Sequence, residues 1–315
     1  VVDLLTEKAI YWDDDHHGAA FYEREIPSEL AHVAAVAREH MIEAVAGLDE
    51  ALTAKYLDDE EISADQLRKA IREATLGLKV VPVLCGSAFK NKGVQPLLDA
   101  IVDYLPSPLD VAAVEGIHPR DESVVVREAD DNAPFSALAF KLATDKHVGH
   151  LAYVRVYSGH VKAGDQILNA NRGRKERIGR LLQMHANKRQ DIDEIWAGDI
   201  VAVVGLKEVT TGETLCDFQK PVILESLDFP EPVLSIALEP RTTADMEKLS
   251  TSLQRLVHED PSFRAAVDSE TGQTIISGMG ELHLEIVTDR LLREFQVNAN
   301  VGKPQVAYRE TITKT

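Results

Sequence analysis

The densest positive charge of this sequence lies in ten residues, from Asn171 to Arg180. Its five basic side chains are Arg172, Arg174, Lys175, Arg177 and Arg180. A guanidinium group offers a planar fork of N–H donors that matches phosphate oxygens, so this cluster is suited to a nucleic-acid backbone. The run contains no aromatic side chain on which a base could stack, so it is not expected to read a single strand by sequence. We predict a phosphate contact, and a solvated charged loop is the alternative that composition favours.

The charge of the whole chain limits this prediction to one segment. The 315 residues include 52 acids and 34 Lys or Arg, for a net charge of -18, which argues against a nonspecific nucleic-acid binder. Residues 1–130 hold 26 acids against 12 basic residues, whereas residues 155–190 hold nine basic residues against two acids. One basic segment of an acidic chain is therefore predicted to face phosphate.

A second segment, from Ser277 to Glu285, combines two glycines with groups that could do acid–base or metal chemistry. Gly278 and Gly280 permit a tight strand-to-helix turn and the close approach of another backbone. On a helix, Glu281 and Glu285 share a face while His283 points elsewhere, and no Cys or second His completes a zinc site. We predict a docking corner against a neighbouring domain. A purely structural turn and an enzyme that uses Glu281, His283 or Glu285 remain alternatives.

A search for nucleotide-binding motifs finds only partial matches. A P-loop needs a glycine-rich turn before Lys-Ser/Thr, but the Gly302-Lys303 pair is followed by Pro304. The run 15–18 fits the loose Asp-x-x-Gly pattern of GTPase switches, and the run 187–190 resembles the guanine-reading Asn-Lys-x-Asp, with Asp191 one place late. We interpret both as chance matches, and expect this chain to hold neither GTP nor a metal ion.

The remaining composition is that of a soluble protein of the reducing cytosol. Cys85 and Cys216 are expected to be buried thiols, with a disulfide as the less favoured alternative. No apolar run reaches the roughly 20 residues of a membrane helix, and Val1–Glu7 lacks the features of a signal peptide. We expect a cytoplasmic monomer without a membrane partner. The missing initiator Met and the ending at Thr315 suggest part of a longer protein.

The elements that must position these residues fall into three regions, of which the first is mixed. Residues 1–26 indicate one or two hairpins, and helices are predicted after Ser28 as N-cap and after Ser63, where Ser63 and Gln66 fit a capping box. The apolar run 79–85 predicts a strand buried on both faces, followed by the turn Gly86-Ser87-Ala88. An amphipathic helix over 94–105 completes one unit of an α/β sheet.

The other two regions differ in pattern. Residues 120–227 show short strands separated by regular turns, which predicts a closed β-barrel. Residues 228–302 predict the order βαββαβ, the split ferredoxin-like arrangement. The expected fold class is therefore multidomain: an α/β part over 1–110, an all-β barrel over 111–227, an α+β domain over 228–303, and the start of a further domain over 304–315.

Several runs resemble elongation factor G, the ribosomal translocase of bacteria. Val83–Gln95 and Asp103–Asp110 look like the end of its G domain, and the barrel is similar to its second domain through Arg155–Gly159 and the run from Val209 to Asp217. Gly272–Glu285 resembles its third domain, and Val301–Thr311 resembles the entry into its fourth domain. The resemblance covers essentially the whole chain.

This resemblance implies a GTPase parent that moves tRNA and mRNA on the ribosome with GTP and Mg²⁺. It implies that Gly86, Ser87 and Ala88 form the guanine-side loop, and that the helical region before them is the acidic insertion facing the large-subunit stalk. It also implies that the barrel touches small-subunit ribosomal RNA, and that Gly278, Gly280, Leu282 and His283 form an interdomain corner where a steroid antibiotic binds. The alternatives are a stand-alone RNA- or ribosome-binding module, or a piece of a related GTPase of the release factor three or tetracycline-protection type.

Overall fold

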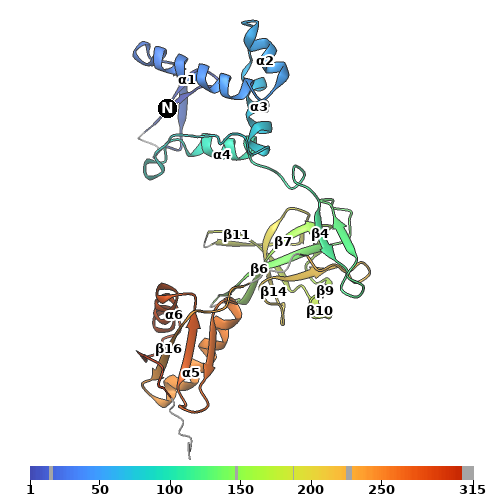
Figure 1. Ribbon diagram of the computed structural model, residues 1–315, viewed down its shortest axis with the longest axis vertical. Helices are drawn as coiled ribbons and strands as arrows, with labels where there is room; N and C mark the ends of the chain where they lie inside the picture. The colour runs from blue at the N-terminus through green and yellow to red at the C-terminus, as the bar shows by residue number, and fades with distance from the viewer. Residues whose placement is uncertain (14–16, 146–147, 187, 225–228, 307–315) are drawn as a thin grey trace, which may run out of the picture. The chain divides into compact units, whose positions relative to one another are not determined.

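The computed structural model divides the chain into two compact units, Val1–Val111 and Ala112–Thr315 (Figure 1). It describes residues 1–13, 17–145, 148–186, 188–224 and 229–306. The runs 15–18 and 187–190 and the tail to Thr311 therefore lie partly outside the described residues. No described helix combines the length and the apolar composition that crossing a membrane requires.

The first unit joins a small antiparallel sheet to four α-helices. The strands follow one another in the order β1 (Val2–Asp3), β2 (Lys8–Trp12) and β3 (Phe21–Glu25). The helices are α1 (Ser28–Ala46), α2 (Glu50–Leu57), α3 (Ala64–Leu76) and α4 (Val94–Tyr104), and a 3₁₀ turn, η1, spans Ala88–Lys90. The hairpins and three of the helices were predicted, whereas α2 was missed.

Helix α3 supplies the centre of the first unit's core. Leu67 is fully buried and packs with Ile71, Val45 and Tyr104. The capping box predicted at Ser63 is confirmed, since the Gln66 N–H donates to Ser63 Oγ and the Ser63 N–H donates to Gln66 Oε1. The N-cap predicted at Ser28 is wrong, because α1 already includes Ser28 and makes no side-chain cap bond.

The buried strand predicted over residues 79–85 is not formed. This run has no ladder partner, Val81 and Val83 are 84% and 86% exposed, and Cys85 is exposed instead of buried. A strand of this kind needs ladder hydrogen bonds and cover on both faces, and the described part of the first unit offers it no neighbouring strand. Helix α4 is present, but its apolar stripe is exposed as well, with Val102 at 78%.

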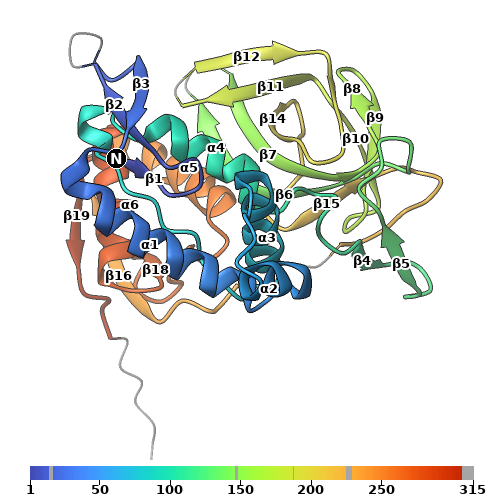
Figure 2. The ribbon, with the colours of Figure 1, turned by 90° about the horizontal axis from the view of Figure 1, so that it is seen from above.

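Eight strands of the second unit belong to one curved antiparallel sheet, which we call the barrel. Its order is β10-β9-β15-β6-β7-β14-β11-β12. The strands are β6 (Ser136–Asp145), β7 (Gly149–Ser158), β9 (Gln166–Asn169), β10 (Arg174–Arg177), β11 (Arg180–His185), β12 (Lys188–Ile192), β14 (Ile200–Val204) and β15 (Glu213–Cys216). The strands β8 (Val161–Lys162) and β13 (Glu194–Ile195) form a separate antiparallel pair. Figure 2 shows the strands of the barrel curving around one interior.

Alternating side chains of these strands fill a single interior. Ala137, Val154, Leu181, Ile195 and Leu215 are among the fully buried residues of this core. The hairpin of β4 (Val114–Ile117) and β5 (Val124–Arg127) covers part of the outer surface, and the buried Cys216 lies in the small cluster beneath it. The predicted short strands and turns are thus present, whereas no ladder among the described residues joins β10 to β12.

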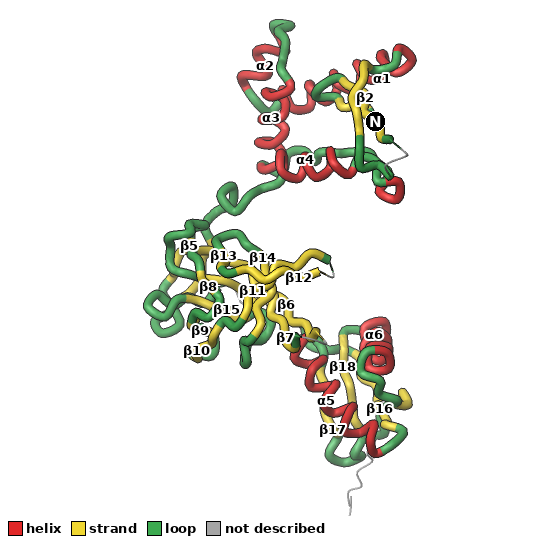
Figure 3. The backbone as a smooth tube through the Cα atoms, turned by 180° about the vertical axis from the view of Figure 1, so that it is seen from behind, coloured by secondary structure: helices red, strands yellow, loops and turns green. Residues whose placement is uncertain are grey.

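The last part of the second unit is an antiparallel sheet with two helices on one face (Figure 3). The elements are β16 (Leu234–Pro240), α5 (Thr243–Glu259), β17 (Arg264–Val267), β18 (Thr274–Gly278), α6 (Glu281–Arg293) and β19 (Ala299–Gly302), and the sheet order is β17-β18-β16-β19. The βαββαβ order agrees with the prediction. Leu249, Leu253 and Leu256 of α5 enter the core, whereas Met246 and Val257 are 58% and 38% exposed.

Candidate functional site

Strand β10 and the turn before it present the basic segment at the surface of the barrel. Antiparallel pairing with β9 places Glu176 opposite the buried Ile167 and Lys175 opposite Leu168. Because successive side chains of a strand alternate, Lys175 and Arg177 share the outward face. Glu176 is 7% exposed, and its two carboxylate oxygens accept from the N–H groups of Lys207 and Glu208 at 3.1 Å. Glu176 thereby ties β10 to the loop after β14.

Three of the five predicted phosphate ligands are engaged by carboxylates of the barrel itself. Arg172 Nε donates to Glu213 Oε1 at 2.6 Å, and Arg174 pairs with Glu208. Arg180 forms a two-pronged pair with Asp191, with Nε–Oδ1 and Nη2–Oδ2 distances of 2.9 and 3.0 Å. This contact holds the pKa of Asp191 below its usual range and links β11 to β12.

Glu213 is the most buried carboxylate of this group, and its surroundings are built for the charged form. Burial acts to raise the pKa of Glu213, but the N–H of Thr210, Arg172 and the Asn169 side chain outweigh it, so the pKa lies below its ordinary value. Asn169 Nδ2 and the Thr210 N–H each donate to Oε2 at 2.8 Å. Arg172 therefore belongs to an internal network, which the sequence could not reveal because Glu213 is 41 residues away.

Lys175 and Arg177 are in a different position from the other three. The Lys175 ammonium lies 5.0 Å from the centre of the Phe218 ring, and Arg177 Nε donates to the Gly164 carbonyl at 3.1 Å. Neither side chain forms an ion pair with any carboxylate in the part of the chain that the structure describes. Their positive charge is thus available to an outside anion, and the phosphate contact of the five basic residues stays a prediction.

The predicted corner lies where β18 passes into α6, and His283 holds it together. The Met279 N–H donates to His283 Nδ1 at 3.1 Å, and Nε2 lies 3.0 Å from Asp260 Oδ2 at the end of α5. A Cβ on Gly278 would meet Leu284 Cδ2 at 2.9 Å and His283 Nδ1 at 3.0 Å, so a side chain here would force these groups of α6 to shift. Gly280 has open space around it. The atoms closest to Gly278 belong to side chains of this chain, so the predicted approach of a neighbouring backbone stays a prediction.

An apolar surface surrounds this corner. Met279 and Leu282 are 37% and 70% exposed, and Ile286 follows Leu282 one helical turn later at 52%. Val233 and Leu234 are exposed beside them, because Leu234 pairs with Gly278 and the Val233 N–H donates to the Gly278 carbonyl. Leu282 is thus an outward surface residue, whereas His283 is mostly an internal strut. Glu281 and Glu285 are exposed on the helix.

The loop with Gly86, Ser87 and Ala88 is pinched into a tight turn in the first unit. The N–H groups of Ser87 and Lys92 donate to each other's carbonyls at 2.8 and 3.0 Å, and a Cβ on Gly86 would meet the Lys92 carbonyl oxygen at 2.8 Å. The β2–β3 turn docks against the far side of this loop, where Gln95 Nε2 donates to the Gly18 carbonyl at 2.9 Å. The sequence pattern gave no sign of that docking.

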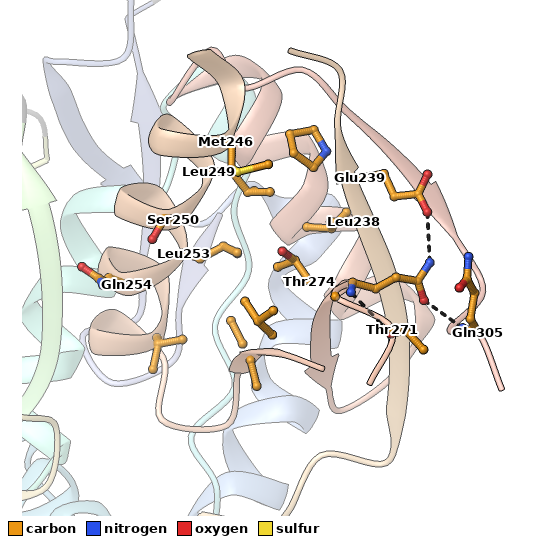
Figure 4. A pocket seen from close by; sticks show the side chains of 17 residues that line it. Leu238, Glu239, Met246, Leu249, Ser250, Leu253, Gln254, Thr271, Thr274 and Gln305 are labelled. Atoms are coloured by element: carbon orange, nitrogen blue, oxygen red, sulfur yellow. Dashed lines mark hydrogen bonds between the residues drawn. The ribbon is translucent and has the colours of Figure 1, made fainter. Parts of the chain in front are cut away.

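A cavity of about 770 Å³ lies between α5 and the β17–β18 hairpin (Figure 4). Leu249 and Leu253 of the helix and Leu238 of β16 form its apolar wall. On its polar side, Gln273 Nε2 donates to Glu239 Oε1 at 3.0 Å, and Gln273 Oε1 accepts the Gln305 N–H at 2.8 Å. The cavity does not contain the corner residues. Among the described residues, no three His, Cys, Asp or Glu side chains are placed to hold a metal ion.

Comparison with known proteins assigns both parts of the second unit. Residues 134–218 match the family model of elongation factor G domain 2, and residues 229–303 match that of elongation factor G, domain III. Together these matches cover about half of the chain. The chain belongs to the elongation factor G family.

A solved structure supports the same relationship over the whole length. A crystal structure of a protein from Thermus thermophilus aligns with 99% of this chain at 30% sequence identity and a TM-score of 0.77. The chain spans 44% of that protein. The barrel is thus domain II, and the βαββαβ part is domain III, of a translation elongation factor, a class of protein that acts in protein biosynthesis. The resemblance seen in the sequence is confirmed at the level of the family.

Proposed function

We propose that this chain is part of a translational GTPase of the elongation factor G type, which drives tRNA and mRNA movement on the ribosome. The two successive domain matches carry this proposal. In the intact protein, GTP with Mg²⁺ would be the nucleotide, and Gly86, Ser87 and Ala88 would approach the guanine. The 315 residues hold no P-loop, so this chain alone neither binds nor hydrolyses GTP.

The surface of the first unit supports its assignment as the end of a G domain with an inserted subdomain. Val81, Val83 and the stripe of α4 are apolar and exposed, as expected of a strand and helix that complete a larger α/β sheet. Residues 28–61 hold nine acids against two basic residues, which suits the proposed contact of this helical part with the large-subunit stalk. We assign residues 1–110 to this G-domain part.

The barrel, assigned to residues 111–227, is proposed to contact small-subunit ribosomal RNA. Lys175 and Arg177 support this contact, because they are exposed cations without a carboxylate partner among the described residues. Arg172, Arg174 and Arg180 are left out, since their guanidinium groups already pair with acids. Phosphate contacts of this type position a protein on RNA and weaken with salt.

Domain III, assigned to residues 228–303, is proposed to be a ferredoxin-like relay between the G domain and the domains that follow. The sheet order and the βαββαβ sequence of elements agree with that fold. The exposed apolar surface of Val233, Leu234, Met279, Leu282 and Ile286 is the proposed docking corner, and Leu282 is the residue best placed to touch a ligand there. Residues 304–315 would begin the next domain of a cytoplasmic, monomeric protein.

A ribosome-pelleting assay tests this function. The chain is mixed with small subunits and sedimented at several salt concentrations, beside the Lys175→Gln/Arg177→Gln variant and the matched Arg174→Gln/Arg180→Gln variant. We expect binding that weakens with salt, a smaller salt dependence in the first variant, and an unchanged salt dependence in the second. A chain that stays in the supernatant at the lowest salt would contradict the proposed ribosome contact.

A further inference from the structure

A strip on the outer surface of the barrel combines aromatic rings with cations on neighbouring strands. It consists of Phe140 and Lys141 of β6, Tyr153 and Arg155 of β7, and Ile200 of β14, and we call it the β6–β7 strip. Strand pairing brings these side chains together, because Arg155 lies opposite Ile200 and Tyr153 lies opposite Lys141. None of them belongs to the basic segment around β10.

A β-bulge creates the exposed ring at the centre of this strip. The register passes from Ala139 opposite Val154 to Lys141 opposite Tyr153, so Phe140 is the extra residue. A bulge re-aims side chains, and here both Phe140 and the following Lys141 are exposed at the surface. The Phe140 and Tyr153 rings have centres 6.4 Å apart and planes inclined by 54°. A strand without the bulge would turn one of these two side chains inward.

The cations of the strip lie over aromatic rings and have no acid beside them. The Lys141 ammonium lies 5.7 Å from the Tyr153 ring centre, and the Arg155 guanidinium lies 5.2 Å from that of Tyr157. Neither forms an ion pair with a carboxylate among the residues that the structure describes. On the same barrel, Arg172 and Arg180 are paired with acids. The positive charge of the strip is therefore open to a partner.

The strip is also left uncovered by the rest of the barrel. The β4–β5 hairpin shields the outer surface near Tyr157, and a second buried cluster forms around Leu182 and Ala202. Between these covered areas, Phe140 and Ile200 remain 36% and 56% exposed. One exposed ring, Phe140, beside unpaired cations suits a ligand that offers both flat π-faces and negative charge. An unpaired stretch of RNA has this chemistry, since its bases stack on rings and its phosphates attract cations.

We propose that the β6–β7 strip binds a single-stranded RNA segment, with a base stacked on Phe140 and phosphates held by Lys141 and Arg155. This inference rests on the proposed ribosome-binding function and adds a second RNA contact of the barrel to that of Lys175 and Arg177. Lys175 and Arg177 would hold the RNA backbone without regard to its strandedness, whereas the strip distinguishes unpaired RNA from a duplex. An acidic protein surface would also attract the two cations, but it would not need the ring.

The test measures binding of a fluorescein-labelled octauridylate to the full chain by fluorescence anisotropy at low salt. We expect Phe140→Ala to weaken binding about tenfold, a change within the range for one stacked base, and Phe140→Trp to retain it. Lys141→Gln/Arg155→Gln should reduce the slope of log K against log salt by about 1.4, since each contact to a single strand contributes about 0.7. Arg180→Gln is the matched control and should change neither quantity.

Several outcomes would overturn the inference. They are no saturable octauridylate binding, or equal binding of an eight-base-pair RNA duplex with no effect of Phe140→Ala. Circular dichroism of each variant verifies the fold. Pelleting with small subunits separates this inference from the proposed function: pelleting without octauridylate binding rejects only the strip, and octauridylate binding without pelleting rejects only the ribosome contact.

Discussion

Replacing Arg172 by Ala tests whether this residue supports the barrel or contacts RNA. The substitution removes the Nε–H donor that lies 2.6 Å from Glu213 Oε1 and leaves that carboxylate with Asn169 and the Thr210 N–H. The Glu213 side chain is only 12% exposed, so the lost bond is a charge-assisted one in a mostly buried site. Such bonds contribute about 1.5–3 kcal/mol.

The Arg172 side chain is 38% exposed, and solvent screening lowers the expected loss to about 1–2 kcal/mol. In a unit of this size each kcal/mol moves the melting temperature by about 2–4 °C. The matched variant is Arg177→Ala, which removes one exposed bond to the Gly164 carbonyl and should change the free energy of unfolding by less than about 0.5 kcal/mol. The two arginines lie in the same short basic segment, so composition does not distinguish them.

Urea denaturation followed by tryptophan fluorescence gives the stability of the barrel. The chain has two tryptophans, and a Trp12→Phe background leaves Trp196 of the barrel as the reporter. We expect Arg172→Ala to lower the midpoint without changing the salt dependence of small-subunit binding, and Arg177→Ala to do the reverse. The reasoning is refuted if Arg172→Ala leaves the midpoint in place and reduces the salt dependence as much as Arg177→Ala does.

Three further predictions concern other parts of the chain. Titration calorimetry with GTP and Mg²⁺ should give no saturable heat, and micromolar affinity would contradict the account of a chain without phosphate-binding parts. Burial, and then the neighbouring His150, hold the pKa of His258 below its usual value. The neutral imidazole therefore favours the folded state above about pH 6.5, and this stability should be lost on acidification. The urea midpoint of His258→Gln should fall less over the same pH range. Gly278→Ala should cost about 1–3 kcal/mol by overpacking Leu284, whereas Gly280→Ala, with nothing within 4 Å, should be nearly neutral; equal midpoints would refute this.

The periodic parts of the sequence allowed most of the fold to be predicted. The hydrophobic periodicity of the sequence predicts strands such as β7 and β14 and the helices α3 and α6. The Ser63 capping box predicts where α3 begins. The strand predicted over residues 79–85 is not formed. An apolar run of this kind needs neighbouring strands for its hydrogen bonds, and the described residues do not supply them.

The candidate site was predictable only as a location. The cluster of basic residues identified β10 and its turn, but the division between paired and unpaired cations depends on acids that arrive from distant segments, such as Glu208 and Glu213. The β6–β7 strip was missed because Phe140 and Lys141 lie on β6 whereas Tyr153 and Arg155 lie on β7, and the two pairs meet only through strand pairing. The bulge at Phe140 leaves no mark in the pattern of alternation that local sequence could reveal.

Salt-dependent sedimentation with small ribosomal subunits tests the central claim most directly, namely that the barrel of this elongation factor G family chain contacts ribosomal RNA through its unpaired cations. The account predicts that the chain pellets with the subunits and that log K falls linearly with log salt. Lys175→Gln/Arg177→Gln should reduce that slope by about 1.8 if both residues contact duplex phosphates, while Arg174→Gln/Arg180→Gln leaves it unchanged. Equal slopes for the two double variants would contradict the claim.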